Sequence, residues 1–200
     1  MFCDFLEENE TGVFHRRQQP SGSDSSQVLQ QMLVQLHGSL WNKLIRRDLY
    51  ALSGTRFVEG LNFCEDEYVV IRLLSYGCRV GYVARALYHY DKNSNAASYT
   101  NLWNSRTAEE YELFIRSCEP YLRAPLCRPT LDERIAGSIK IMTYAPESRY
   151  ASFKSFYLRQ RDSLRRSRMS LPRKIFCWLY YNGFPQVKKF GKAHQDGARI

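Results

Sequence analysis

The sequence has no C-x-x-C pair, no apolar run long enough to cross a bilayer, and almost no acid in its last quarter. Its six cysteines are dispersed, mostly within apolar runs, which favours reduced, buried thiols over a disulfide framework or a zinc site. Because a membrane-spanning helix needs about 20 apolar residues, we expect none. The first ten residues are acidic, whereas a secretory signal begins with basic residues. These absences indicate a cytoplasmic protein.

The charge is divided unevenly along the chain. The net charge of the 200 residues is +9. Residues 1–148 hold 16 Lys and Arg and 18 Asp and Glu, a net charge of −2. Residues 149–200 hold 13 Lys and Arg against Asp162 and Asp196, a net charge of +11. This basic excess in the C-terminal quarter is the strongest compositional signal.

Apolar periodicity predicts an α/β fold in which a mixed sheet is followed by a mostly helical C-terminal region. Strands are expected at residues 1–6, 13–17, 79–84 and 86–90. Helices are expected at residues 27–37, 40–50, 65–76, 107–117, 130–144, 146–169 and 171–181. We expect Ser25 or Ser26 to cap the first helix and Gly77 to end the third. Because the chain opens inside a strand, we expect it to be cut from something longer.

The triplet Glu65-Asp66-Glu67 stands at the start of an apolar helical run. Acids in a first helical turn stabilise the helix through its dipole. Alternatively, one carboxylate is a general base that takes the proton of an attacking hydroxyl, held in position where a loop meets a rigid helix. Both interpretations stay open on these residues alone.

Two other motifs also allow a structural and a functional interpretation. Trp41, Asn42 and Lys43 lead into Arg46-Arg47, which predicts either an amphipathic helix with a solvated basic face or a cationic, aromatic wall for a phosphate or sugar ligand. His89 lies in a strand-like run and is either a hydrogen-bonded structural residue or a metal ligand completed by carboxylates from elsewhere.

The order of these motifs resembles the C-terminal half of a bacterial family-two glycosyltransferase. The pattern is W-N-K-L-I-R-R, then R-F-x-E-G-x-N-x-x-E-D, a helix, G-Y-x-x-x-A-L-Y-H-Y and an Asn/Ser-rich loop, over about residues 1–99. The resemblance implies a partial GT-A (Rossmann-like) fold and an inverting, nucleotide-sugar-dependent transfer of a sugar to a glycan or lipid-linked acceptor. It implies that the C-terminal region extends this domain.

The resemblance also implies roles for individual residues. Asp66, with Glu65, matches the pair whose acid serves as catalytic base. Trp41, Asn42 and Lys43 match the segment that lines the donor–acceptor cleft. His89 matches a histidine that helps hold the metal (Mg²⁺ or Mn²⁺) and the diphosphate, and residues 93–98 match a loop over the active site.

The sequence departs from the family in lacking its N-terminal, nucleotide-gripping half. No Asp-x-Asp motif occurs anywhere, and no Gly-rich turn follows a strand near the start. The chain alone is therefore expected to be inactive, with an exposed sheet edge where the missing strands would pair. The alternative is a non-catalytic remnant or a basic module that binds a membrane or a partner.

The basic quarter allows three interpretations. The basic residues between Lys154 and Lys174 precede an apolar, aromatic block that ends at Tyr181. They form a solvated helix face, a nucleic-acid site, or an interfacial helix on an anionic membrane. Because the charges and aromatics lie in separate blocks, we expect no nucleic-acid binding. We expect a peripheral protein on the inner face of the cytoplasmic membrane, with domain bounds at 1–100, 101–182 and a polar, basic tail at 183–200.

Overall fold

The computed structural model describes residues 1–93, 105–122, 127–144 and 149–187. The chain forms two compact units: residues 1–102 with 110–130, and residues 103–109 with 131–200. Among the described residues there are one three-stranded mixed sheet and seven α-helices, which confirms the predicted α/β class.

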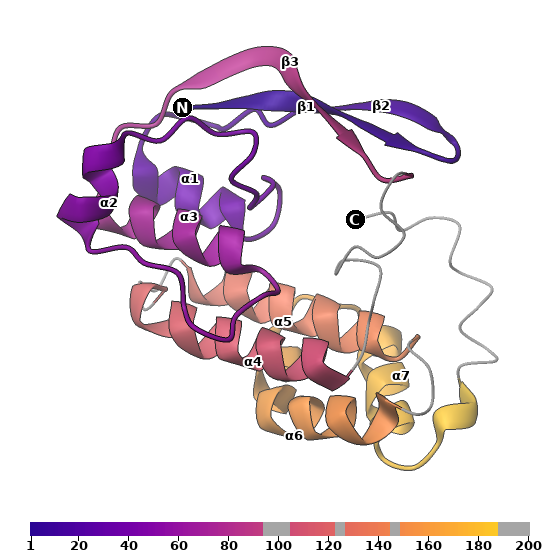
Figure 1. Cartoon of the computed structure of the whole chain (residues 1–200). Coiled ribbons are helices and arrows are strands. Elements are labelled where there is room, and N and C mark those ends of the chain that lie inside the picture. Colours follow the sequence, from indigo (N-terminus) through magenta and orange to yellow (C-terminus); the bar gives the residue numbers. More distant parts are fainter. Residues whose placement is uncertain (94–104, 123–126, 145–148, 188–200) are drawn as a thin grey trace. The chain divides into compact units, whose positions relative to one another are not determined.

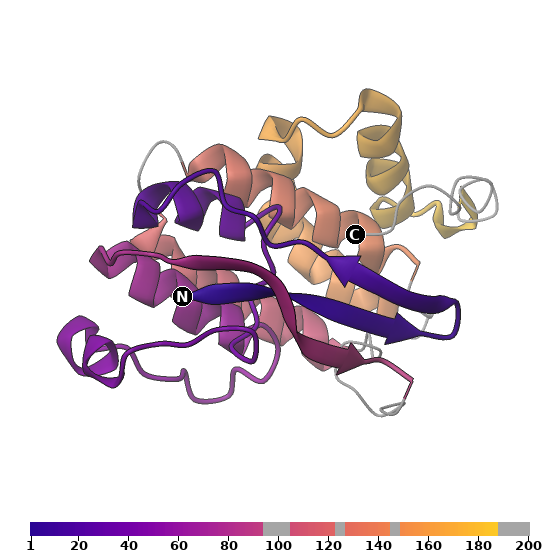
Figure 2. The same cartoon turned by 90° about the horizontal axis from the view of Figure 1, so that it is seen from above.

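The sheet belongs to the first unit and has the strand order β2-β1-β3 (Figure 2). The strand β1 (Phe2–Asn9) pairs with β2 (Gly12–Arg16) antiparallel and with β3 (Tyr82–Asp91) parallel. The predicted strands at 1–6 and 13–17 are confirmed. The prediction of two separate strands at 79–84 and 86–90 is wrong. The chain runs through Arg85 without a turn and forms a single strand.

Helices α1 (Ser25–Met32) and α3 (Glu65–Tyr76) lie side by side against one face of this sheet (Figure 1). The core between them includes the fully buried side chains of Val28, Val69 and Ile71. The bounds of α3 match the predicted 65–76, and Gly77 ends it at φ +90°. The cap of α1 is Asp24 rather than Ser25 or Ser26, because its carboxylate accepts from the first free N–H groups. The helix also ends at Met32, five residues early.

The helix predicted at 40–50 is wrong. Residues 42–44 pair antiparallel with the start of β1 instead: Cys3 N donates to Asn42 O at 3.1 Å, and Leu44 N to Met1 O at 2.8 Å. These bonds use backbone groups that a helix would need for itself. Helix α2 begins only at Arg47 and runs to Ser53 (Arg47–Ser53).

The helices predicted in the C-terminal region are found, with shifted bounds as α4 (Ser105–Cys118), α5 (Arg128–Met142) and α6 (Tyr150–Arg166), and with the predicted bounds as α7 (Leu171–Tyr181). In the second unit, Arg166 of α6 donates two hydrogen bonds, of 2.7 and 3.0 Å, to the buried carboxylate of Asp132 on α5. The hydroxyl of Tyr181 on α7 donates to Ile139 O of α5 at 3.2 Å. These contacts tie three helices together.

Within the described residues, no helix combines the length and the apolar character that crossing a bilayer demands. All six cysteines have free thiols, three of them buried. The predicted loop at 93–98 and the tail at 183–200 lie for the most part outside the described residues.

Candidate functional site

The site is built around residues 37–43, here called the 37–43 loop, which connects α1 to the segment that pairs with β1. Nζ of Lys43 donates to His37 O at 2.7 Å, to Ser39 O at 2.6 Å and to Oδ1 of Asn42 at 2.8 Å. An ammonium group has three donors. All three donors of Lys43 are therefore bonded within its own loop, and these bonds fix the shape of that loop.

Burial lowers the pKa of Lys43 from 10.5 to about 8, against the negative charges of Asp66 and Glu67, which raise it. The loss of hydration disfavours the ammonium more than the two carboxylates favour it. Lys43 therefore titrates close to neutral pH, so the charge at the centre of the loop depends on pH in the physiological range.

Asp66 joins the first turn of α3 to the same loop. Its Oδ2 accepts a hydrogen bond from Leu40 N at 3.0 Å. The half-buried side chain therefore has a fixed position beside the loop, as expected for a carboxylate at the junction of a loop and a rigid helix. Its other oxygen has no hydrogen-bond partner among the described residues.

Asn42 is buried and connects the loop to the sheet. Its Nδ2 donates to Cys3 O at 3.0 Å, and its Oδ1 accepts from Oγ of Ser39 at 3.2 Å as well as from Lys43. Both ends of the amide are thus occupied by protein. The predicted substrate contact of Asn42 is replaced, in this structure, by a structural connection between the loop and β1.

Trp41 contacts a group of aromatic rings in the carboxyl half of β3. Its ring stacks on Tyr88 with centroids 4.4 Å apart and on Tyr90 at 5.1 Å, and it meets Phe5 edge-on at 4.8 Å. Ligands of sheets with parallel strands bind near the carboxyl ends of those strands. The aromatic group around Trp41 therefore lies toward the end of β3 where a substrate is expected, whereas Asn42 and Lys43 pair with the amino end of β1.

Glu65 is the acid of the triplet with a perturbed titration. Burial raises its pKa, and the charges of Asp66 and Glu110 raise it further, against a backbone hydrogen bond that lowers it. The surroundings of Glu65 thus disfavour its charged form, whereas Asp66 has a position fixed by its hydrogen bond to Leu40 N.

His89 does not join these residues. Successive side chains of a strand point to opposite faces, so His89 lies on the face opposite Tyr88, Tyr90 and therefore Trp41. Its Nε2 lies 2.9 Å from Oε2 of Glu8, with both side chains partly exposed. Among the described residues, no group of three His, Cys, Asp or Glu side chains is arranged to hold a metal ion.

The sequence analysis missed Asp4, a buried carboxylate in the middle of β1. It accepts from the hydroxyl of Tyr82 at 2.6 Å, from Gln18 N at 2.7 Å and lies 2.9 Å from Nε2 of His15. Burial opposes its charge, but these hydrogen bonds outweigh burial and lower the pKa of Asp4. Burial and the bond to Asp4 raise the pKa of Tyr82 to about 12. An acid inside an apolar strand was the signal that could have identified it.

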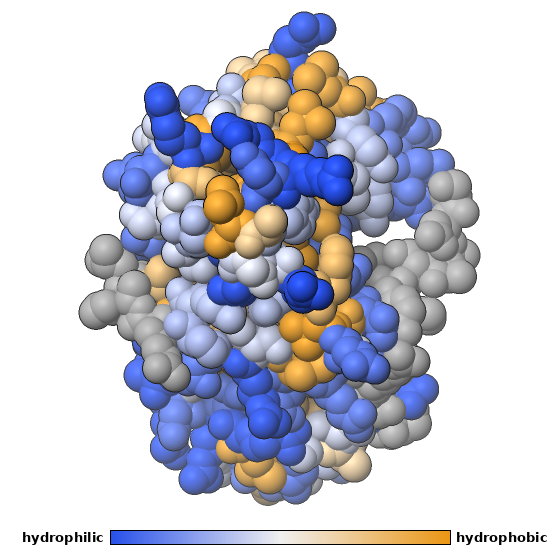
Figure 3. All heavy atoms as spheres, turned by 60° about the vertical axis from the view of Figure 1, so that its left-hand side comes forward, coloured by the Kyte–Doolittle hydropathy of each residue, from blue (hydrophilic) through white to orange (hydrophobic). Residues whose placement is uncertain are grey.

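A second missed feature is an apolar pocket of about 720 Å³ in the first unit. Its lining comes from the start of β1 and from α1, α2 and α3, and includes Phe2, Met32, Leu49 and Leu73. Figure 3 shows the face that carries α2, where apolar side chains gather beside strongly hydrophilic ones. Because Phe2 and Gly81 line it, the pocket lies at the amino ends of β1 and β3, and Lys43 of the 37–43 loop also contributes to its lining.

Comparison of the chain with protein-family models, with curated proteins and with solved structures finds no match in any of the three. The functional argument therefore depends on the residues and their geometry.

Proposed function

We propose that this chain is the acceptor-side part of an inverting, nucleotide-sugar-dependent glycosyltransferase with a partial GT-A (Rossmann-like) fold. One observation carries the proposal: Asp66 is bonded to the backbone of the loop that contains Trp41 and Lys43. Segments about 25 residues apart in the sequence meet there in the combination that the resemblance implies.

In the proposed reaction, Asp66 takes the proton of an acceptor hydroxyl as that oxygen attacks the anomeric carbon of the donor sugar. A new C–O bond forms on one side of the carbon while the bond to the nucleoside diphosphate breaks on the other. The configuration inverts, and the diphosphate leaves with the electron pair. The oxygen of Asp66 that is not bonded to Leu40 is the one available for the proton.

Glu65 supports this chemistry from the adjacent position. Burial raises its pKa above the ordinary value, so the charged form of Glu65 is less favoured beside Asp66 than it would be in water. The aromatic group of Trp41, Tyr88 and Tyr90 offers a flat apolar surface, and ligand sites are lined mainly by apolar and aromatic side chains. Tyr88 is 38% exposed and reachable by an acceptor.

A divalent ion, where family-two enzymes use one, neutralises charge on the leaving diphosphate. The described residues do not fit such a site, since His89 pairs with Glu8 and no third ligand joins them. No step here uses a metal. Because the acceptors considered include lipid-linked sugars, we infer a cytoplasmic location on the inner face of the cytoplasmic membrane.

A second function is favoured by a specific observation: all three protons of Lys43 are bonded to its own loop. The resemblance assigns Lys43 to the substrate cleft, but each of its three donors already has a partner in the protein. This favours a non-catalytic remnant or binding module. The two functions differ in whether the chain binds a saccharide at Trp41.

The test follows the fluorescence of Trp41 in the full chain with Trp103→Phe and Trp178→Phe. Hexoses, N-acetylhexosamines and oligosaccharides are added, and release of nucleoside diphosphate from UDP-, GDP- and dTDP-sugars is measured in parallel with Mn²⁺. We expect saccharides to change the emission, and Asp66→Asn to keep this binding while abolishing any transfer. Absence of saccharide binding, or full transfer by Asp66→Asn, would overturn the proposal. Tight binding of a nucleotide sugar would overturn the non-catalytic alternative.

A further inference from the structure

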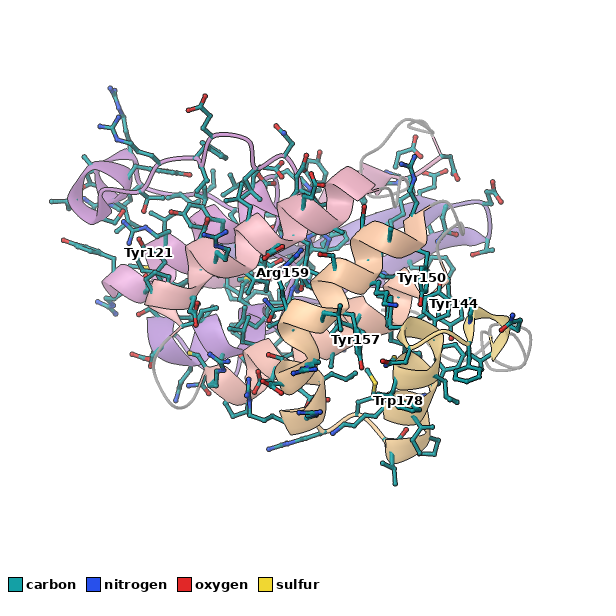
Figure 4. The ribbon with its side chains drawn as sticks, turned by 90° about the horizontal axis from the view of Figure 1, so that it is seen from below. Tyr121, Tyr144, Tyr150, Tyr157, Arg159 and Trp178 are labelled. Carbon is teal, nitrogen blue, oxygen red and sulfur yellow. The ribbon has the colours of Figure 1, made fainter. Side chains whose placement is uncertain are left out.

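Helix α7 (Leu171–Tyr181) has two apolar faces, of which its own unit uses only one. The inner face carries the buried side chains of Cys177, Tyr180 and Tyr181. The ring of Tyr181 stacks on Tyr157 of α6 with centroids 4.7 Å apart. Tyr150 of α6 donates its hydroxyl proton to Tyr180 O at 3.1 Å. Figure 4 shows Tyr150 and Tyr157 on α6, on its side toward α7. One apolar face is sufficient to pack a surface helix.

The outer face exposes three large apolar side chains. Leu171 is 69% exposed, Ile175 47% and Trp178 52%. Their spacing of four and then three residues places them in one line along the helix. Within the described residues, nothing about the packing of α7 requires this line, which we call the outer stripe.

The outer stripe lies in the most basic part of the chain. Residues 149–187 contain nine Lys and Arg against one acid, Asp162. Some of the charge is used internally, since Arg166 binds Asp132 and Lys174 binds the carbonyls of residues 165 and 167. The side chains of Arg161, Arg168 and Arg173 are exposed, and Arg173 belongs to α7 itself. The helices that carry the exposed apolar line therefore also carry exposed positive charge.

We propose that the outer stripe of α7 is a membrane-contact surface that binds anionic lipid. Trp178, Ile175 and Leu171 would enter the boundary between headgroups and acyl chains, and the exposed arginines would bind the headgroup phosphates. Trp is the residue that favours this depth, because its ring is apolar and its N–H is polar. With 11 residues, α7 is long enough to lie in the interface but not to cross the bilayer.

The charge distinguishes a lipid surface from other occupants. A second copy would bring the same basic surface against this one, and like charges repel. A nucleic acid would need several aromatic faces in a basic groove, whereas the stripe is aliphatic apart from Trp178. An anionic lipid surface satisfies both the apolar stripe and the arginines. The proposal is independent of the proposed sugar transfer.

The test is co-sedimentation of the full chain with vesicles of phosphatidylcholine alone or with about one third phosphatidylglycerol. We expect binding to the anionic vesicles only, with a blue shift in tryptophan emission that Trp178→Phe removes. The double variant Ile175→Ser/Trp178→Ser should lose binding. Val34→Ser, which removes an apolar side chain 60% exposed in the first unit, is the matched control and should bind as wild type.

The charge term has its own readout. Replacing Arg161, Arg168 and Arg173 by Gln should weaken binding roughly five-fold per charge at low salt. Equal binding to both vesicle types, or unchanged binding of the Ser variants, would overturn the proposal. The proposal would also be overturned if the wild type bound no lipid but formed a dimer or retained DNA, and the Ser variants abolished that dimer or DNA binding. Circular dichroism confirms that each variant keeps its helices. None of these measurements requires a sugar donor.

Discussion

The titration of Lys43 provides the sharpest test of the site geometry. Its pKa is about 8 in the folded chain against an ordinary value of 10.5, because the ammonium is buried. The folded state therefore binds the proton more weakly than the unfolded state does. Below pH 8 both states carry the proton, and the folded state bears the full cost of the buried charge. As pH rises from 8 toward 10.5, the folded state gives up the proton first and its relative stability increases.

The magnitude follows from the two pKa values. The difference between 10.5 and 8 corresponds to about 3 kcal/mol in the free energy of unfolding between low and high pH. Between pH 7 and pH 9 the contribution of Lys43 should rise by about 1 kcal/mol. We expect urea unfolding to show this rise in the difference between wild type and Lys43→Met, since the variant has no ionisable group at the position.

The comparison with Lys43→Met removes titrations that do not depend on Lys43. Burial raises the pKa of Cys177 to about 12 and that of Tyr82 to about 12, so these groups change stability with pH in both proteins alike. The difference between the two proteins reports Lys43 together with the amino group of Met1, whose pKa is lowered by burial and by the charge of Lys43, against Cys78, which raises it. A difference that is constant from pH 7 to pH 9 would show that the ammonium is solvated, and that the 37–43 loop is not built around it.

Other contacts give three further predictions. Gly38→Ala would bring a new Cβ to 2.6 Å from Cβ of Glu67 and should cost about 1–3 kcal/mol in urea unfolding. Gly137→Ala in α5, where the added Cβ meets nothing within 4 Å, should stabilise the chain by up to about 1 kcal/mol. If the two variants changed the free energy of unfolding equally, both glycine predictions would be contradicted. Asp4→Ala should cost about 1–3 kcal/mol. Because hydrogen bonds lower the pKa of Asp4, its contribution to stability should be lost only as pH falls below 3.8, the ordinary pKa of an Asp carboxyl. A stability difference between wild type and Asp4→Ala that stayed unchanged down to about pH 2 would refute this prediction. Asp66→Asn keeps a side-chain oxygen that accepts from the backbone N–H of Leu40. The thermal midpoint of this variant should therefore exceed that of Asp66→Ala, which loses about 1 kcal/mol of stability with the hydrogen bond.

The parts of the fold that local pattern determines were predictable. Helix α3 follows from its apolar period and from Gly77, whose φ of +90° favours glycine. The bounds of α7 and the hairpin of β1 and β2 follow from similar local signals. Each of these segments has a local preference that agrees with its final environment.

The 37–43 loop and the segment after it were not predictable in this way. Trp41 and Leu44 have helical spacing, but residues 42–44 pair with residues 1–3, about 40 positions away. A contact that distant leaves no trace in a local period. The same limit applies to Asp4, whose partners Gln18 and Tyr82 come from separate segments.

The candidate site was predictable in its members but not in their connections. Trp41, Lys43 and Asp66 do come together, whereas His89 faces the opposite side of the strand and binds Glu8. The direction of His89 depends on the register of β3. The two short strands predicted at 79–84 and 86–90 left that register undefined, because a shift of one residue exchanges the two faces.

The connections also limit what a loss of activity would mean. Lys43 shapes the loop, and Asp66 is bonded to the backbone of that loop at Leu40. Removing Lys43 therefore displaces Asp66 even if the ammonium never contacts a substrate. An inactive Lys43→Met variant is evidence for substrate contact only if its stability and saccharide binding are unchanged. Asp66→Asn carries less of this ambiguity, because its amide oxygen keeps the bond to Leu40. It removes the ability to take a proton and also one negative charge that raises the pKa of Lys43, so it is compared with the wild type at a pH well below 8.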